Sequence, residues 1–415
     1  MVSTHSVLQS AKDAAERSSG RARAPARRRA AADRGDGDVR MISRAELAAW
    51  PAWRGAFAGH RKDARFYELL EDTLADGFDY RWLAVRDGGG AVAAVQPAFV
   101  VDQDLVEGAG QGARAFAAAV RRAWPGFLRL RTLMVGCVAG EGHLSGDADS
   151  HASLARALAG GIVGVAQTLR APLIVLKEFP KAYRAPLQAF EARGFSRIPS
   201  LPMTRLPIAY ASFDDYMARA LNSATRRKLR KKFRIAAAAA DPIEMSVVAD
   251  AAPFVDEIYP LYLATYERSA LRFEKLTKGF FAEIGRRMPG KARFFLWRQG
   301  GRIVAFSLCM PEGDALFAEY VGFDYAVALT LHLYHWCVRD MIGWAMAHGF
   351  TEFRSSALNY DPKLHMRHRL DPVDLYVRHL WGPANWLLKA ALPWIEPTRQ
   401  DPILRKFANY AELWD

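Results

Sequence analysis

The sequence predicts an α/β protein built from two tandem modules of similar organisation. Residues 82–100 and 294–310 each consist of an apolar run, a polar pair, glycines and a second apolar run. Glycine supplies the positive φ that a tight turn needs, so each segment indicates a β-hairpin. The same order of strand, helix, strand, helix and strand then follows each hairpin. The length of 415 residues agrees with two modules, because it exceeds the length of one average domain.

The elements of the two copies can be placed in order along the chain. After the first hairpin we expect a strand at 130–139, a helix at 152–169 and a strand at 172–179. A helix followed by a strand is expected over 187–198. The corresponding segments of the second copy are 314–323, 328–348, 351–356 and 373–380. Two more helices, at 253–269 and 276–288, lie between the copies. We therefore expect an N-terminal module at 41–210 and a C-terminal module at 211–415.

Residues 1–40 differ in composition from the rest of the chain. They are rich in arginine, alanine and glycine, carry nine basic and five acidic residues, and show no usable apolar period, which predicts a disordered basic tail. Frequent arginine and serine would suit a mitochondrial transit peptide, but the acidic residues count against it. The chain could also start at Met41, where helical patterning begins.

Several classes of protein have no support in the sequence. No uncharged run reaches the roughly 18 residues that span a bilayer, and no apolar segment of a signal peptide is present, so we expect a cytoplasmic protein without stable membrane insertion. Cys137, Cys309 and Cys337 form no CxxC pair, which disfavours disulfides and structural zinc. Motifs for serine hydrolysis, nucleotide hydrolysis and dinucleotide redox chemistry are missing.

The net charge of +13 is concentrated in the tail and in residues 219–234, which carry eight basic and no acidic residues. We expect a basic helix over 213–240 that docks through a narrow apolar stripe. The stripe consists of Leu221, Thr225, Leu229, Phe233, Ala236 and Ala240. The cations Arg226, Arg227, Arg230, Lys231 and Arg234 would then point outward or toward a cleft.

Three interpretations of this basic helix remain: a phosphate-binding element, a solvated face and a membrane-surface helix. A membrane-surface helix needs a wider apolar face with aromatic anchors. Phosphate contact is favoured because no acidic partner at i+4 neutralises the charges locally.

Four segments in order resemble the GNAT superfamily of acyltransferases: 223–234, 296–324, 344–350 and 359–365. More closely, they resemble its double-module branch, with Fem-type aminoacyltransferases, peptidoglycan biosynthesis/recognition proteins and CelD-like acetyltransferases. The likeness covers 205–380, whereas over 41–205 only the element order supports it. It implies two GNAT-like modules with mixed sheets flanked by helices. It also implies N-acyl transfer in the C-terminal module, by direct attack of an acceptor amine on an activated acyl carbonyl.

The resemblance implies acyl-CoA, such as acetyl-CoA, or aminoacyl-tRNA as the donor, a small-molecule amine as the acceptor and no metal. GNAT modules grip the coenzyme A pyrophosphate with a glycine-rich loop after the central strand, but here no glycine follows Gly322 in the run to 336. This departure keeps aminoacyl-tRNA open as the donor, and tRNA as a partner. The candidates for donor binding are Gly322, Phe323, Thr330, Arg226, Arg227 and Arg230. A DNA-binding role is not expected, because the basic helix lacks a helix-turn-helix partner.

Glu319 is the candidate general base, at the position where many GNAT enzymes carry a central-strand glutamate. Alternation along a strand would place it on one face with Phe317, Val321 and Phe323. Burial among apolar neighbours would raise the pKa of its carboxyl, which suits a base that deprotonates an attacking amine. The alternative is a structural ion pair with an arginine such as Arg293 or Arg354.

Lys363 resembles the lysine of the terminal tyrosine–lysine motif of related transferases, which implies support of the donor phosphate or of a developing oxyanion. Its alternative is a solvent-exposed lysine at a helix start, because Asp361 and Pro362 are typical of a helix N-terminus. Tyr320 and His335 complete the catalytic candidates, with His365 as another acid or base.

Two pairs of histidines, 332 with 335 and 365 with 368, have i, i+3 spacing. No HExxH or ExxH pattern accompanies them, so we expect packed histidines and no metal site. The N-terminal module has no carboxylate on its equivalent strand, 130–139, and is expected to shape the cleft. The competing hypothesis is a non-catalytic GNAT scaffold that binds tRNA, a glycan precursor or a partner protein.

Overall fold

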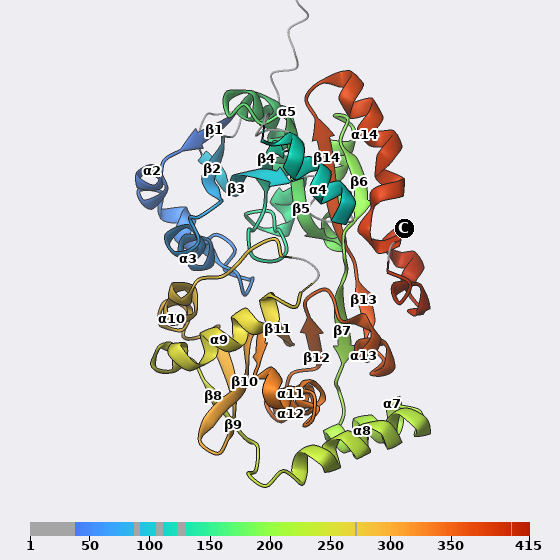
Figure 1. The fold of residues 1–415 in the computed structure, drawn as a ribbon. Helices are drawn as coiled ribbons and strands as arrows, with labels where there is room; N and C mark the ends of the chain where they lie inside the picture. The colour runs from blue at the N-terminus through green and yellow to red at the C-terminus, as the bar shows by residue number, and fades with distance from the viewer. Residues whose placement is uncertain (1–37, 87–91, 105–110, 123–128, 270–271, 400) are drawn as a thin grey trace, which may run out of the picture. The chain divides into compact units, whose positions relative to one another are not determined.

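The structure, a computed structural model, describes residues 38–86, 92–104, 111–122, 129–269, 272–399 and 401–415 (Figure 1). Most of the predicted tail therefore lies outside the described residues. The rest forms two mixed sheets of seven strands, each flanked by helices, which confirms the predicted α/β class with two mixed sheets flanked by helices. None of the helices in these ranges is both long and apolar enough to cross a bilayer.

The first sheet has the strand order β1-β2-β3-β4-β5-β14-β6. Its strands are β1 (Val39–Ile42), β2 (Asp79–Arg86), β3 (Val92–Asp104), β4 (Arg129–Val135), β5 (Leu173–Pro180), β6 (Ser196–Pro199) and β14 (Val373–His379). Only β4 and β5 are parallel neighbours. β2 and β3 form the first predicted hairpin, whose turn lies outside the described residues.

The second sheet has the order β13-β7-β12-β11-β10-β9-β8. Its strands are β7 (Met203–Pro207), β8 (Glu244–Val248), β9 (Arg293–Gln299), β10 (Arg302–Glu312), β11 (Ala315–Phe323), β12 (Glu352–Ser355) and β13 (Arg369–Asp371). Only β11 and β12 are parallel. The second predicted hairpin is confirmed, and Gly300 and Gly301 supply positive φ angles of 55° and 80° at its turn.

The two modules exchange their last strands. β7 follows β6 in the chain but pairs with β12 and β13 of the second sheet. Reciprocally, β14 follows β13 but inserts between β5 and β6 of the first sheet. Figure 1 shows these two connections running in opposite directions between the sheets. The boundary expected at 210 thus separates the two sequence copies but not the two sheets.

One hydrophobic core is shared by both sheets. Trp82 and Phe99 of the first sheet and Phe294 and Phe306 of the second belong to it, with α3 (Ala64–Thr73), α9 (Val255–Tyr266) and α10 (Lys278–Arg287). The opposite face of the first sheet is covered by α5 (His151–Thr168) and α6 (Arg184–Glu191). The opposite face of the second is covered by α7 (Phe213–Ala220), α8 (Ser223–Ala237) and α12 (Leu333–Ala347).

The remaining helices connect these layers. They are α2 (Arg44–Ala48), α4 (Gln111–Val120), α11 (Tyr325–Ala328), α13 (Tyr360–His365) and α14 (Gly382–Ile395), with short 3-10 turns, among them η1 (Pro51–Gly55). The helical pattern expected from Met41 begins at Arg44, where Ser43 and Glu46 form a capping box. Met41 itself pairs with Leu83 in the first sheet.

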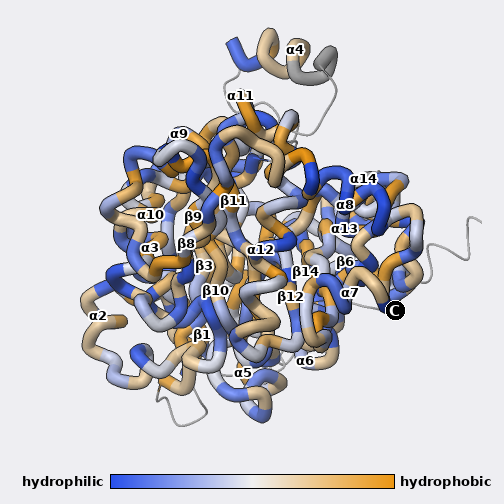
Figure 2. The backbone as a smooth tube through the Cα atoms, turned by 90° about the horizontal axis from the view of Figure 1, so that it is seen from below, coloured by the Kyte–Doolittle hydropathy of each residue, from blue (hydrophilic) through white to orange (hydrophobic). Residues whose placement is uncertain are grey.

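The basic segment expected as one helix over 213–240 forms two helices, α7 and α8. Leu221 is extended, and the side chain of Asn222 accepts a hydrogen bond from a first-turn N–H of α8. Such a cap starts a new helix because it satisfies a backbone donor that the helix leaves unpaired. The predicted stripe is buried or half-buried as far as Ala236, whereas Ala240 lies beyond α8 and is exposed. Figure 2 shows most of α8 as hydrophilic.

Candidate functional site

The strands β11 and β12 pair over a short stretch and then separate. Ala315 to Ala318 pair with Glu352 to Ser355, and β12 ends there. β11 continues over 319–323 with β10 as its only neighbouring strand. The backbone groups of this stretch that face away from β10 form an open edge, and a linear ligand with amide groups can pair with such an edge.

The corresponding gap in the first module is closed by its own loop, 136–146. Gly142 N donates to Glu178 O at 3.1 Å, and Lys177 Nζ donates to Gly140 O at 2.8 Å, both across the end of β5. A Cβ atom on Gly142 would lie 2.7 Å from Lys177 O. The loop therefore packs too closely to leave room for a ligand, and the open edge belongs to the second module.

Glu319 lies at a β-bulge. The pairing with β10 skips Glu319, because Ala318 and Tyr320 oppose consecutive residues of that strand. An inserted residue breaks strict alternation, so Val321 and Phe323 pack into the core under α12, on the face opposite to Glu319. The predicted common face of Glu319, Val321 and Phe323 is therefore wrong.

Two buried cations from the first module bind the carboxylate of Glu319. Lys62 Nζ lies 3.2 Å from Glu319 Oε2, and Arg61 Nε donates to Oε1. The side chains of Arg61 and Lys62 are 1% and 0% exposed, and both belong to the segment between η1 and α3. The predicted alternative of a structural ion pair thus occurs, with partners other than Arg293 or Arg354.

Further carboxylates complete this ion-pair network. Lys62 Nζ is 2.8 Å from Glu141 Oε2, and the backbone N of Arg61 donates to Glu312 Oε2 at 2.7 Å. Burial alone would raise the pKa of Glu141, but the charges of Arg61 and Lys62 hold it well below its usual range. The pKa of Glu312 also falls, to about 2, because His60 and Arg61 outweigh the effect of burial.

Lys363 is buried beside the point where the strands separate. Its Nζ donates to the carbonyl oxygen of Ser356, the first residue after β12, at 2.6 Å. Lys363 is only 6% exposed, and burial lowers its pKa to about 7. No ion pair with it occurs in the described part of the chain. A substantial fraction of this amine is therefore neutral near pH 7, and a neutral amine can accept a proton.

The turn before α13 fixes the position of Lys363. Leu358 and Asn359 adopt positive φ angles of 73° and 50°, which cost energy for residues other than glycine. Asn359 is the N-cap residue of α13, and Asp361 and Pro362 lie in its first turn, so the helix start predicted here is confirmed. The predicted alternative of a solvent-exposed lysine does not occur.

The structure does not bring Glu319 and Lys363 together as one pair. Lys363 lies near His368, whose pKa is lowered to about 3 by burial first and by the charge of Lys363 second. The ring of His368 is 6.3 Å from that of Phe353, which belongs to the core under α12. Lys363 is thus associated with the α12 face of the sheet, whereas Glu319 points to the other face.

The other candidates on and after β11 have structural contacts. Tyr320 donates to Glu274 Oε1 at 2.9 Å, and burial raises the pKa of its phenol well above the usual value. A Cβ atom on Gly322 would lie 2.6 Å from the backbone of α9, so this glycine allows close helix packing. Phe323 is buried under α12, and Thr330 Oγ1 donates within its own turn.

The two predicted histidine pairs lie in different segments, one at α12 and the other at α13. His335 is half-buried, and its Nε2 is 2.8 Å from Lys232 Nζ. Burial and the Lys232 charge lower the pKa of His335 to about 4, so it is neutral near pH 7 and accepts this hydrogen bond. His332 precedes α12, and His365 is exposed on α13. Across the described ranges, no three metal-binding side chains gather into a group.

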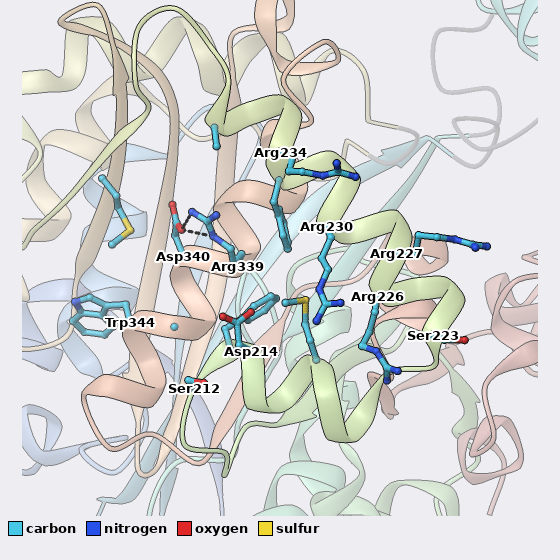
Figure 3. A pocket seen from close by; sticks show the side chains of 16 residues that line it. Ser212, Asp214, Ser223, Arg226, Arg227, Arg230, Arg234, Arg339, Asp340 and Trp344 are labelled. Carbon is cyan, nitrogen blue, oxygen red and sulfur yellow. Dashed lines mark hydrogen bonds and ion pairs between the residues drawn. The ribbon is translucent and has the colours of Figure 1, made fainter.

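A pocket of about 1150 Å³ lies between α7, α8 and α12, which we call the α8 groove (Figure 3). Its charged lining residues are Asp214, Arg226, Arg227, Arg230, Arg234, Arg339 and Asp340. In Figure 3, Arg230 points from α8 toward α7, whereas Arg227 points away. Within the described residues, the guanidinium groups of Arg227, Arg230 and Arg234 have neither a hydrogen-bond nor an ion-pair partner, so they are available to an anion.

Arg226 has a structural role that the sequence did not indicate. Its Nη1 donates to Ala218 O at 3.2 Å and also to Leu221 O, at the end of α7. A cation at a helix C-terminus satisfies carbonyls that the helix leaves unpaired and interacts favourably with its dipole. Arg226 thus lies at the groove, in agreement with the second of the two predicted orientations, outward or toward a cleft, and it also binds the end of α7.

Sequence reasoning also missed the residues that surround Glu319. They are His60, Arg61, Lys62, Glu141, His143 and Glu312. Their strongest signal in the sequence is the run of charged residues at 60–63, which has the composition of an ordinary solvated turn. Only the packing of the two modules shows that this run is buried.

A comparison of the sequence with models of protein families finds a match. The model of the FemAB-like family, described as peptidoglycan biosynthesis/recognition, matches residues 71–373. No curated protein matches the chain in sequence.

Similar solved structures include FemX, which is 13% identical at a TM-score of 0.49 and covers 85% of this chain and 100% of its own. A C-terminal domain of a putative lysylphosphatidylglycerol synthetase from Agrobacterium fabrum is 14% identical at 0.44, covering 71% and 84%. A tandem GNAT protein from the clavulanic acid biosynthesis pathway is 9% identical at 0.44, covering 83% and 99%. Likenesses this distant carry no argument about activity.

Proposed function

Because the chain belongs to the FemAB-like family, we propose that it transfers an acyl or aminoacyl group from an activated carrier to an amine acceptor. The observation that carries this proposal is the open edge of β11 at 319–323, with the buried amine of Lys363 beside the point where β12 leaves it. An extended carrier arm can pair with the edge, which would hold its carbonyl near Lys363.

In the proposed step, the nitrogen of the acceptor amine attacks the acyl carbon and forms an amide bond. The C–O bond of an ester donor, or the C–S bond of a thioester, breaks. Neutral Lys363 takes the proton that the nitrogen loses and returns one to the leaving oxygen or sulfur, which suits a pKa of about 7. We assign Glu319, the base that the sequence suggests, to holding the two modules together, because Arg61 and Lys62 occupy both of its oxygens.

The α8 groove supports a phosphate-bearing carrier, either acyl-CoA or aminoacyl-tRNA. Arg227, Arg230 and Arg234 line it and form no ion pair with the described residues, and each phosphate contact would make donor binding weaken steeply with salt. The turn after β11 is filled by α11 and lacks the glycine-rich loop, which favours aminoacyl-tRNA over acetyl-CoA. Both carriers are cytoplasmic, which agrees with the compartment that we expect.

To test the proposal, the protein is incubated with amine acceptors and with either radiolabelled acetyl-CoA or tRNA charged with a radiolabelled amino acid. Amide formation is then measured from pH 5 to 9. We expect kcat/KM to rise with pH through about 7. Lys363→Met and Lys363→Arg should both lose at least about a hundredfold, because neither supplies a neutral amine. The exposed Lys181→Met is the matched control and should retain the wild-type rate. A Lys363→Arg variant with the wild-type rate and pH profile would rule out the base assignment.

One observation favours a second function, a scaffold that binds without catalysis. Arg61 and Lys62 fill the face of β11 in front of Glu319, where the sequence predicts the base. Isothermal titration with acetyl-CoA, longer acyl-CoAs and aminoacyl-tRNA distinguishes the two. Tight binding of a carrier with no transfer to any amine at any pH supports the scaffold, whereas turnover supports the transferase.

A further inference from the structure

The helix α14 is docked along one side only. Asn385 Oδ1 accepts from His379 N at 2.9 Å, and Asn385 Nδ2 donates to Gly194 O at 3.0 Å. Leu388 and Leu392, on the same side of the helix, pack into the shared core. In Figure 1, α14 lies beside β14 and β6 at the margin of the first sheet. Its other side has no covering element in the described part of the chain.

The uncovered side of α14 is apolar. Its exposed apolar residues include Pro383, Trp386, Leu387, Ala390 and Ala391, which follow the spacing of one helical face, and Lys389 is the exposed charged residue of the helix. Trp386 and Leu387 are 69% and 59% exposed, and Trp381 just before the helix is 64% exposed. These are three of the six large hydrophobic side chains exposed among the described residues. They form a patch, in contrast to scattered surface residues that need no explanation.

The exposed charges along this segment of the chain are of one sign. Over 378–399, the exposed or half-exposed charged residues are Arg378, Lys389 and Arg399. The only acidic residue there, Glu396, is fully buried and bound by Arg399 and Thr398. An apolar face with tryptophans and a basic rim complements a surface that has an apolar interior and a negatively charged outer layer.

We propose that the exposed face of α14 docks on the surface of an anionic phospholipid bilayer. Trp381 and Trp386 would lie at the boundary of headgroups and acyl chains, where indole rings are favoured, and Leu387 would reach into the acyl region. Lys389 and the neighbouring arginines would contact lipid phosphates. A second copy of this chain fits the patch less well, because a two-fold contact would bring two basic rims together.

The test uses the full-length protein and sedimentation with vesicles. One set is phosphatidylcholine alone, and the other is an equimolar mixture with phosphatidylglycerol. We expect binding to the mixed vesicles that weakens as salt rises, and little binding to phosphatidylcholine. Trp386→Ser combined with Leu387→Ser should weaken it by about tenfold or more, because both side chains lose their apolar transfer energy. The exposed Phe116→Ser on α4 is the matched control and should bind as the wild type does.

Several results would overturn this proposal. One is no binding to either set of vesicles; another is binding that the α14 substitutions leave unchanged. A dimer that forms without lipid and dissociates in the Trp386→Ser, Leu387→Ser variant would assign the face to a second copy. Circular dichroism of each variant checks that the fold is retained, which is expected because the substituted side chains are exposed. Vesicle binding does not depend on turnover, so its outcome is independent of the proposed transferase activity.

Discussion

Replacing Lys62 by methionine tests the buried ion-pair network that joins the two modules. Lys62 is fully buried, and its Nζ lies 2.8 Å from Glu141 and 3.2 Å from Glu319. The substitution keeps most of the apolar stem but removes the charge. Among the described lysines and arginines, Arg61 alone then remains paired with the buried carboxylates of Glu141 and Glu319, and it also contacts Glu312. Breaking a buried ion pair in this way costs about 3–5 kcal/mol, because a charge remains buried without compensation.

A double variant separates this cost from lost packing. Lys62→Met combined with Glu319→Gln removes one cation and one carboxylate together, so less uncompensated charge stays buried. We expect its destabilisation to be smaller than the sum of the two single effects by about 1–3 kcal/mol. Lys278→Met is the matched control, because its ion pair with Asp256 is exposed and worth less than about 1 kcal/mol.

Urea unfolding followed by fluorescence and circular dichroism gives the midpoint and slope for each variant. The pH dependence gives a second readout. The native pKa of Glu141 is held well below its usual value, so its contribution is present above the unfolded pKa of about 4.3 and is lost as pH falls toward the native one. The wild type should therefore lose stability below about pH 5, and Lys62→Met should lose less. Strict additivity in the double variant, or equal acid sensitivity, would refute the reasoning.

Two further predictions concern local packing and the basic helix. Gly322→Ala should destabilise the protein by about 1–3 kcal/mol in urea unfolding, because the added methyl meets the backbone of α9. Gly343→Ala on α12, where nothing lies within 4 Å of the added methyl, should be neutral or stabilising in the same measurement. Arg226→Ala should cost about 1 kcal/mol through the lost hydrogen bonds to α7. Arg227→Ala should leave the free energy of unfolding within about 0.5 kcal/mol of the wild type, but it should reduce the salt dependence of tRNA or polyphosphate binding by about one charge. If Arg226→Ala changed only the salt dependence and Arg227→Ala changed only the stability, the roles assigned to these arginines would be contradicted.

The order and type of the elements within the two predicted copies were readable from the sequence. The paired hairpins, the strands that follow them and the intervening helices follow from local features: glycines at turns and apolar periodicity. The core face of α8 was also predictable from Thr225 to Ala236, because helical spacing alone determines which side chains share a face. Lys363 was identified as a candidate by its resemblance to a family motif. Its burial and its lowered pKa were not predicted from the sequence.

Tertiary structure decided which groups meet. The exchange of β7 and β14 cannot be read from the chain, because each strand has the same pattern whichever sheet it joins. The bulge at Glu319 is set by pairing with β10, and one inserted residue moves the following side chains to the other face. Arg61 bonds Glu319 across 258 positions of sequence. No local pattern encodes a contact at that separation, since it exists only after both sheets pack on one core.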